Sequence, residues 1–152
     1  MQVELAETYD IKAWMDLAQE VAPLFGPMDG FETVLRRKIW QRQAYCVRSP
    51  DQRLMGAMLF GGVGKEFWIR WLAVSLDARR QGVGRSLVNT AILITPLDST
   101  LSVDTFAEGE PGAMEAGGLY RSCGFEPTER WQENQIVRDR YKWASVSSDQ
   151  DQ

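Results

Sequence analysis

The stretch Arg79-Arg80-Gln81-Gly82-Val83-Gly84-Arg85-Ser86 sets the interpretation of the whole chain. Residues 69–74, just before it, are mostly apolar, and over residues 83–94 apolar side chains recur at the spacing of a helix. The local order is therefore a strand, a short basic loop and a helix. Free N–H groups at the start of a helix, together with the helix dipole, attract an anion. Because glycines let a phosphate come close to the backbone, this stretch predicts a pyrophosphate-binding loop.

The length of the chain bounds the number of domains. Its 152 residues suffice for one domain with a proper core but not for two. We expect a single domain over residues 1–144, since no internal repeat or interdomain linker is visible. Residues 145–152 are polar and have no apolar residue after Val146, which predicts a disordered tail.

Charge and residue types exclude several classes of function. The net charge of −4 argues against a nucleic-acid binder, which is usually basic, and is compatible with a cationic substrate. The absence of histidine removes histidine-based general base chemistry, a Ser-His-Asp triad and histidine-ligated zinc. The two cysteines, Cys46 and Cys123, are far apart and do not have the spacing of metal ligands. We therefore expect no metal.

The cysteines, the apolar runs and the first ten residues predict the cellular compartment of the protein. Two well-separated cysteines are typical of buried free thiols in a reducing compartment. No apolar run approaches the about 20 residues of a membrane span. Residues 1–10 lack the basic and then apolar pattern of a signal sequence. We expect a cytoplasmic protein with no membrane partner.

The remaining segments predict an α/β fold. In chain order we expect a strand at residues 3–6, helices at 10–21 and near 29–41, a hairpin of strands at 44–48 and 54–60, a strand at 66–74, a helix at 83–94, a strand at 99–106, a helix that includes 113–120, and a last strand within 131–143. This order implies a mixed sheet with helices on its faces.

Two other glycine patterns do not fit known nucleotide sites. Gly61-Gly62-Val63-Gly64-Lys65 looks like a phosphate loop, but that motif needs a glycine where Leu59 stands and a serine or threonine where Glu66 stands. A dinucleotide-binding fingerprint in the opening stretch would need a third glycine at the position of Leu87. Both interpretations are therefore rejected.

Three motifs follow one another in the order of one known family. The loop matches the pattern Arg or Gln, two residues, Gly, one residue, Gly or Ala. Leu72-Ala73-Val74 stands about five residues before it, and Leu119-Tyr120-Arg121-Ser122-Cys123-Gly124-Phe125 matches Leu-Tyr, three residues, Gly-Phe. Together they resemble the GNAT superfamily of acyl-CoA N-acyltransferases over residues 68–126, whereas the N-terminal half matches only in element order. The resemblance implies a mixed, mostly antiparallel central sheet of about six or seven strands with about four flanking helices.

The resemblance also implies acetyl-CoA as the co-substrate. The CoA pyrophosphate would lie on the loop, which consists of Arg79, Arg80, Gln81, Gly82, Val83, Gly84, Arg85 and Ser86. The backbone of Leu72, Ala73 and Val74 would pair with the pantetheine arm as an additional strand would. The N–H near Leu72 would polarise the thioester carbonyl, where attack by an amine places negative charge.

The resemblance gives one candidate acid and no certain base. Tyr120 would donate a proton to the departing thiolate, although a tyrosine at this place could simply belong to the core. Where many relatives have an Asn that contacts CoA, this chain has Ala113, and where some have a basic carboxylate it has Trp68. Glu66 and Asp104, near the ends of two central strands, are the remaining candidates, and each could also be a surface charge.

The acceptor site is the least defined. Residues 24–30 contain Phe25, Met28 and Asp29, which either pack between two helices or form a wall of a substrate pocket. Most of the six tryptophans should lie in the core, and one or two could line an acceptor pocket with Phe25. Gly117-Gly118 allows either close approach of CoA or tight packing of a helix on the sheet.

The predicted activity is transfer of an acetyl group from acetyl-CoA to a primary amine of a small molecule or peptide. Transfer should be direct, because neither cysteine has a histidine to activate it. The alternative is a non-catalytic acyl-CoA-binding regulatory domain, which Ala113 and Trp68 would suit. The expected partners are acyl-CoA and an amine acceptor, and the resemblance adds a homodimer, which is common in the family.

Overall fold

The computed structural model describes residues 1–25, 28–107, 112–133 and 135–143. In chain order the elements are β1 (Glu4–Leu5), η1 (Thr8–Asp10), α1 (Ile11–Phe25), α2 (Phe31–Trp40), β2 (Ala44–Arg48), β3 (Leu54–Val63), β4 (Glu66–Val74), η2 (Leu76–Ala78), α3 (Val83–Ile94), β5 (Thr100–Phe106), α4 (Ala113–Ser122), β6 (Phe125–Glu133) and β7 (Ile136–Trp143). The elements labelled η are short 3₁₀ helices.

The strands form a seven-stranded sheet in the order β1-β2-β3-β4-β5-β7-β6. Strands β4 and β5 pair in parallel. The pairs β1–β2, β2–β3, β5–β7 and β6–β7 are antiparallel. This confirms the expected mixed, mostly antiparallel sheet with helices α1 to α4.

The chain divides into two compact units. The first consists of Met1–Phe60 and Arg70–Thr90, and the second of Gly61–Ile69 and Ala91–Gln152. Strands β3 and β4 and helix α3 each continue from one unit into the other. Each unit has its own buried side chains.

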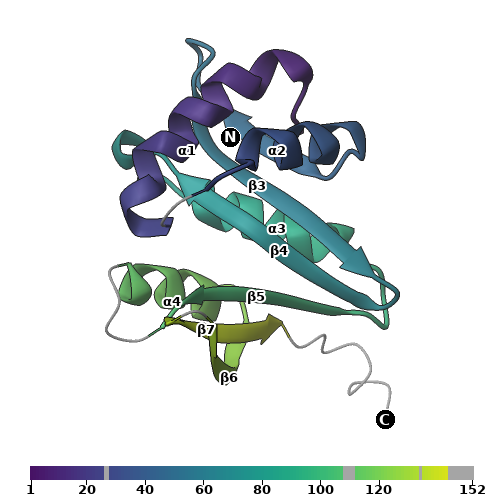
Figure 1. Cartoon of the computed structure of the whole chain (residues 1–152). Helices are drawn as coiled ribbons and strands as arrows, with labels where there is room; N and C mark the ends of the chain where they lie inside the picture. Colours follow the sequence, from purple (N-terminus) through teal and green to yellow (C-terminus); the bar gives the residue numbers. More distant parts are fainter. Residues whose placement is uncertain (26–27, 108–111, 134, 144–152) are drawn as a thin grey trace. The chain divides into compact units, whose positions relative to one another are not determined.

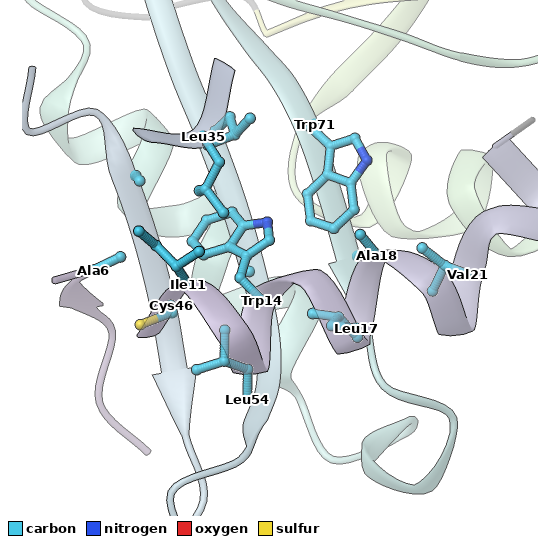
Figure 2. Close-up of a cluster of buried hydrophobic side chains, with 14 residues drawn as sticks. Ala6, Ile11, Trp14, Leu17, Ala18, Val21, Leu35, Cys46, Leu54 and Trp71 are labelled. Atoms are coloured by element: carbon cyan, nitrogen blue, oxygen red, sulfur yellow. The ribbon is translucent and has the colours of Figure 1, made fainter. Parts of the chain in front are cut away.

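The core of the first unit lies under α1 and α2, which share one face of its strands (Figure 1). Trp14 of α1 is fully buried, and its ring lies 5.9 Å from that of Trp71 on β4 (Figure 2). Phe31 of α2 lies 5.2 Å from the same Trp71 ring. The rest of the apolar stripe of α1 follows the helical spacing expected from the sequence, with Ile11, Leu17, Ala18 and Val21 all buried.

Gly56 lets α3 approach the opposite side of β3. A Cβ atom at Gly56 would lie 2.5 Å from Val83 Cγ1, 3.1 Å from the Ala73 carbonyl oxygen and 3.2 Å from Leu87 Cδ1. Only a glycine leaves room for these atoms. Because Val83 begins α3, this contact fixes the start of the helix against the sheet.

A buried ion pair ties the N-terminal segment to β2. Arg48 donates to both carboxylate oxygens of Asp10, from Nε at 2.9 Å and Nη2 at 2.7 Å. The Glu7 N–H donates to the same carboxylate at 2.8 Å. Burial alone would raise the pKa of Asp10, but the hydrogen bonds from Arg48 and Glu7 outweigh it and lower the pKa below 3.8. The pair therefore stabilises the fold at neutral pH.

We expect Asp10→Asn to lower the free energy of unfolding by about 3 kcal/mol, the lower end for a broken buried pair, because Glu4 still pairs with Arg48 at 3.2 Å. The exposed pair Lys12–Asp16 supplies the control, and Asp16→Asn should cost less than about 0.5 kcal/mol. Urea unfolding would measure both.

The stability difference between the wild type and Asp10→Asn should also depend on pH. A carboxylate whose pKa is lowered on folding stabilises above its unfolded pKa, and this contribution is lost as the pH falls through the folded pKa. The difference in unfolding free energy between the two proteins should therefore have its full size above about pH 4 and become smaller below it. An Asp10→Asn variant as stable as the wild type at pH 7 would show that the pair contributes nothing.

The second unit packs α4 against β5 and β6. Tyr120 of α4 is buried, with its ring 5.6 Å from Phe125 and 6.0 Å from Tyr141. A Cβ atom at Gly117 would lie 2.8 Å from the Tyr141 hydroxyl oxygen, whereas Gly118 faces open space. Of the two roles considered for this glycine pair, tight helix packing therefore holds for Gly117.

The expected end of the first helix is wrong. The helix expected over residues 10–21 continues through Pro23 to Phe25 as α1. Both Pro23 and Gln19, the residue four positions earlier whose carbonyl loses its N–H partner, are exposed, so water can bond that carbonyl. The last strand expected within residues 131–143 is confirmed as β7, whereas β6, with which it forms a hairpin, was not expected.

The missed strand β6 has a physical explanation. It lies at the edge of the sheet, where one side needs no pairing and polar residues and Pro127 are tolerated. The disordered tail expected at residues 145–152 lies outside the described residues.

Candidate functional site

The glycine-rich loop leads directly into α3, as the sequence predicts. The helix begins at Val83, and its first hydrogen bond joins the Ser86 N–H to the Gly82 carbonyl at 3.0 Å. Gly82 is exposed, has φ of +84°, and has nothing within 4 Å of the position of a Cβ. The N–H groups of Val83, Gly84 and Arg85 lie in the first turn, where no intrahelical carbonyl can accept them. An anion can therefore reach these groups.

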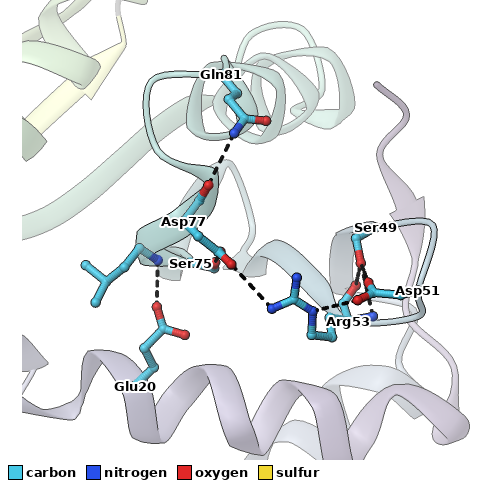
Figure 3. Close-up of polar contacts among 8 residues, drawn as sticks. Glu20, Ser49, Asp51, Arg53, Ser75, Asp77 and Gln81 are labelled. Atoms are coloured by element: carbon cyan, nitrogen blue, oxygen red, sulfur yellow. Dashed lines mark hydrogen bonds and ion pairs between the residues drawn. The ribbon is translucent and has the colours of Figure 1, made fainter.

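A polar network holds the approach to this loop (Figure 3). Glu20 of α1 accepts a hydrogen bond from the Leu76 N–H at 2.6 Å, and Arg53, just before β3, pairs with Asp77 at 3.3 Å. The Ser75 hydroxyl also bonds Asp77, and the side chain of Gln81 donates to the Asp77 carbonyl at 3.2 Å. The segment between β4 and α3 is thus held at several points before any ligand binds.

The arginines of the loop differ in their exposure. Arg79 is half-buried and donates to the Val74 carbonyl at 3.5 Å. Arg80 and Arg85 are exposed. Arg80 has φ of +65°, an uncommon conformation for a residue with a side chain. The loop therefore carries positive charge beside the first turn of α3.

Strand β4 carries the other predicted cofactor residues. Leu72 and Val74 are half-buried and Ala73 is buried. Beyond them, the Ser75 N–H donates to the Met55 carbonyl at 2.9 Å. The registered pairs between β4 and β5 run from Glu66↔Thr100 to Ile69↔Val103, whereas β4 continues to Val74. Residues 70–74 thus extend the strand beyond its last registered pair with β5.

A pocket of about 470 Å³ lies in the first unit between α2 and the strands. Its lining residues are Phe31, Val34, Arg37 and Lys38 of α2, Leu59 of β3, and Arg70 and Trp71 of β4. Lys38 Nζ donates to Gln43 Oε1 at 2.9 Å and to the Phe60 carbonyl at 2.8 Å. The pocket is therefore part aromatic and part cationic.

Tyr120 belongs to the second unit. Burial, and to a lesser degree the nearby Cys123, raises the pKa of its phenol well above the usual value. The phenol is therefore protonated at neutral pH, as a proton donor must be.

The family follows from the arrangement of strand, glycine loop and helix and from a match in sequence. Residues 41–127 match the family model described as "Acetyltransferase (GNAT) domain", which covers more than half of the chain. The chain belongs to the GNAT acetyltransferase family. A comparison with the curated proteins gives no match.

Solved structures of GNAT proteins share the fold. A GNAT-family acetyltransferase from Bacillus cereus has a TM-score of 0.75 at 14% identity, over 93% of this chain and 94% of that one. The ribosomal-protein-S18-alanine N-acetyltransferase of Escherichia coli gives 0.72 at 18%, over 96% and 97%. A chain of the NatC complex bound to Gag peptide and CoA gives 0.72 at 18%, over 95% and 99%. At such identities the likeness shows the fold alone.

The candidate bases have different surroundings in this GNAT chain. Glu66 is exposed at the start of β4. Asp104 accepts two hydrogen bonds from Arg140, from Nε at 2.8 Å and Nη2 at 3.1 Å. The Arg140 guanidinium also lies 4.6 Å from the centre of the Trp68 ring. This pairing gives Asp104 a structural role in the second unit and makes it a poor candidate for a base.

The predicted acceptor residues are only partly described. Met28 packs against the core of the first unit, and Asp29 is exposed just before α2. Phe25 ends α1, and its side chain lies outside what the structure describes. Of the six tryptophans, Trp71 is among the described residues that line the pocket beside α2.

Sequence reasoning missed the cations of that pocket. The available signal was Lys38, which falls on the apolar stripe of α2 with Phe31, Val34 and Leu35. A lysine in such a stripe indicates a charge turned toward the interior.

Among the described residues, no helix has both the length and the apolar character that a membrane span requires. The same residues contain no group of three or more side chains that could together hold a metal ion.

Proposed function

We propose that this GNAT protein transfers an acetyl group from acetyl-CoA directly to a primary amine of a small molecule or peptide. The observation that carries the proposal is the start of α3 behind the exposed Gly82, where the first-turn N–H groups have no intrahelical acceptor and suit a pyrophosphate. The CoA in the NatC complex, a structure of the same fold, supports this choice of cofactor.

In this proposal the first unit anchors the cofactor. The backbone of residues 80–85 binds the pyrophosphate, and the side chains of Arg79, Arg80 and Arg85 add positive charge. The pantetheine arm pairs with the backbone of Leu72, Ala73 and Val74 as an additional strand would. Support comes from β4, which runs past its registered pairs with β5.

The chemistry is nucleophilic substitution at the thioester. The neutral amine attacks the carbonyl carbon, the Leu72 N–H stabilises the negative charge on the carbonyl oxygen, and the C–S bond breaks. Tyr120 donates its proton to the CoA thiolate, the amine nitrogen gives up one proton to solvent, and a proton from solvent restores the Tyr120 phenol. Burial keeps the Tyr120 phenol protonated for this step.

A covalent acetyl-cysteine intermediate is not part of the proposal. Burial raises the pKa of the Cys46 thiol to about 12, so the reactive thiolate is scarce at neutral pH. The chain contains no histidine that could activate either cysteine. The free thiols also support the proposed cytoplasmic setting.

The test measures thiol release from acetyl-CoA with a panel of small amines and peptides, together with the mass of the acetylated amine. We expect release that depends on the amine. Calorimetric binding of acetyl-CoA without release on any amine would contradict the transfer activity and favour a regulatory acyl-CoA-binding domain. Absence of acetyl-CoA binding would overturn both functions.

A further inference from the structure

The pocket between α2 and β4 concentrates positive charge. Arg37 and Lys38 of α2 and Arg70 of β4 line it, and none of its described lining residues is acidic. The chain as a whole carries a net charge of −4. The local charge of the pocket is therefore opposite to that of the protein.

Lys38 is positioned as a donor inside this cluster. Its Nζ donates to Gln43 Oε1 and the Phe60 carbonyl, and an ammonium group has three N–H bonds. One donor is left for a ligand. Burial lowers the pKa of Lys38, and repulsion by the charges of Arg70 and Arg37 lowers it further. A bound anion would relieve this repulsion.

The neighbouring Arg36 shows the contrast. It donates to Glu32 on the exposed side of α2, from Nε at 3.0 Å and Nη2 at 2.8 Å, and it does not line the pocket. One turn of α2 thus carries one arginine paired with a carboxylate and another directed to the pocket.

The other side of the pocket is aromatic. The Phe31 and Trp71 rings lie 5.2 Å apart, and both line the cavity. A volume of about 470 Å³ suits a small ligand or a few residues of a peptide. Such a site favours a ligand that combines an apolar group with a negative charge.

We propose that this pocket selects acceptor amines that carry a carboxylate beside an apolar group, with the carboxylate bound by Arg37, Lys38 and Arg70 and the apolar part against Phe31 and Trp71. The inference rests on the proposed acetyl transfer, whose substrate class it names. The carboxylate can belong to a free amino acid or to an acidic side chain that follows the amino terminus of a peptide.

The experiment compares matched acceptors that differ only in the carboxylate. One pair is phenylalanine and phenylalanine amide, and the other is Phe-Asp-Ala-Ala-amide and Phe-Asn-Ala-Ala-amide. We expect kcat/KM to be at least about tenfold higher for the charged member of at least one pair. The pair that responds identifies the source of the carboxylate.

Arg37→Gln and Arg36→Gln form the matched variants. Both remove one charge from an exposed position of α2, so both should fold. Arg37→Gln should reduce the preference for the charged acceptor by about tenfold, Arg36→Gln should leave it unchanged, and Arg37→Glu should reverse it. Equal use of charged and neutral acceptors by the wild type, or equal effects of the two glutamine variants, would overturn the inference.

A measurement of peptide binding tests the pocket independently of the proposed acetyl transfer. Calorimetry with N-acetyl-Phe-Asp-Ala-Ala-amide and its Asn counterpart needs no turnover. Selective binding of the acidic peptide that is lost in Arg37→Gln would support the pocket even if no acceptor is acetylated. Acetyl transfer without any preference for charge would uphold the activity and overturn the pocket.

Discussion

Gly82→Asp is expected to weaken acetyl-CoA binding by at least about 100-fold, close to a complete loss in most assays. Gly82 adjoins the first turn of α3 and is exposed, with nothing within 4 Å of its Cβ position. A carboxylate there repels the pyrophosphate and competes for the same N–H groups. Charge-assisted hydrogen bonds contribute about 1.5–3 kcal/mol each, so the loss of two accounts for the effect. Isothermal titration calorimetry with acetyl-CoA would measure it.

The control for this variant is Gly64→Asp. Gly64 has φ of +62° and, like Gly82, open space at its Cβ position, but it lies in the turn between β3 and β4. Both substitutions carry the same backbone penalty of roughly 1–2 kcal/mol, and only one adds charge to the proposed phosphate site. If Gly82→Asp binds acetyl-CoA as tightly as Gly64→Asp, the pyrophosphate does not lie on this loop.

The loop could be predicted from sequence because its determinants are local. A strand, two glycines and a helical stripe beginning at Val83 lie within 26 consecutive residues, 69–94, and the structure places the start of α3 at Val83. Its support could not be predicted in the same way. Gly56, which makes room for Val83, and Glu20, which bonds the Leu76 N–H, come from distant segments.

The cationic pocket could be predicted from the sequence even less than the support of the loop. Arg37, Leu59 and Arg70 come from a helix and two strands, and no spacing in the sequence connects them. The net charge of −4 is compatible with a cationic substrate and gives no sign of the cationic pocket, because composition averages over the surface and cannot show a local cluster. From the sequence, Asp104 is also a candidate base. Its ion pair with Arg140 joins two distant segments and is visible only in the structure.

Tyr120→Phe is expected to lower kcat by about 100-fold, the lower range for loss of a general acid, and to change the dissociation constant of acetyl-CoA less than about twofold. The substitution keeps the ring that packs on Phe125 and Tyr141 and removes only the hydroxyl. Since burial raises the pKa of the Tyr120 phenol, the wild type should show no alkaline loss of kcat from this group up to about pH 10.

Tyr141→Phe is the matched control for this prediction. Tyr141 is also buried in the second unit, at 4% exposure as for Tyr120, and its hydroxyl faces Gly117. Loss of that hydroxyl changes the packing beside Gly117 but does not remove the proposed proton donor, so kcat should stay within about threefold of the wild type. Equal turnover of the two phenylalanine variants would mean that Tyr120 is a core residue, and that the thiolate leaves unprotonated or takes its proton from water.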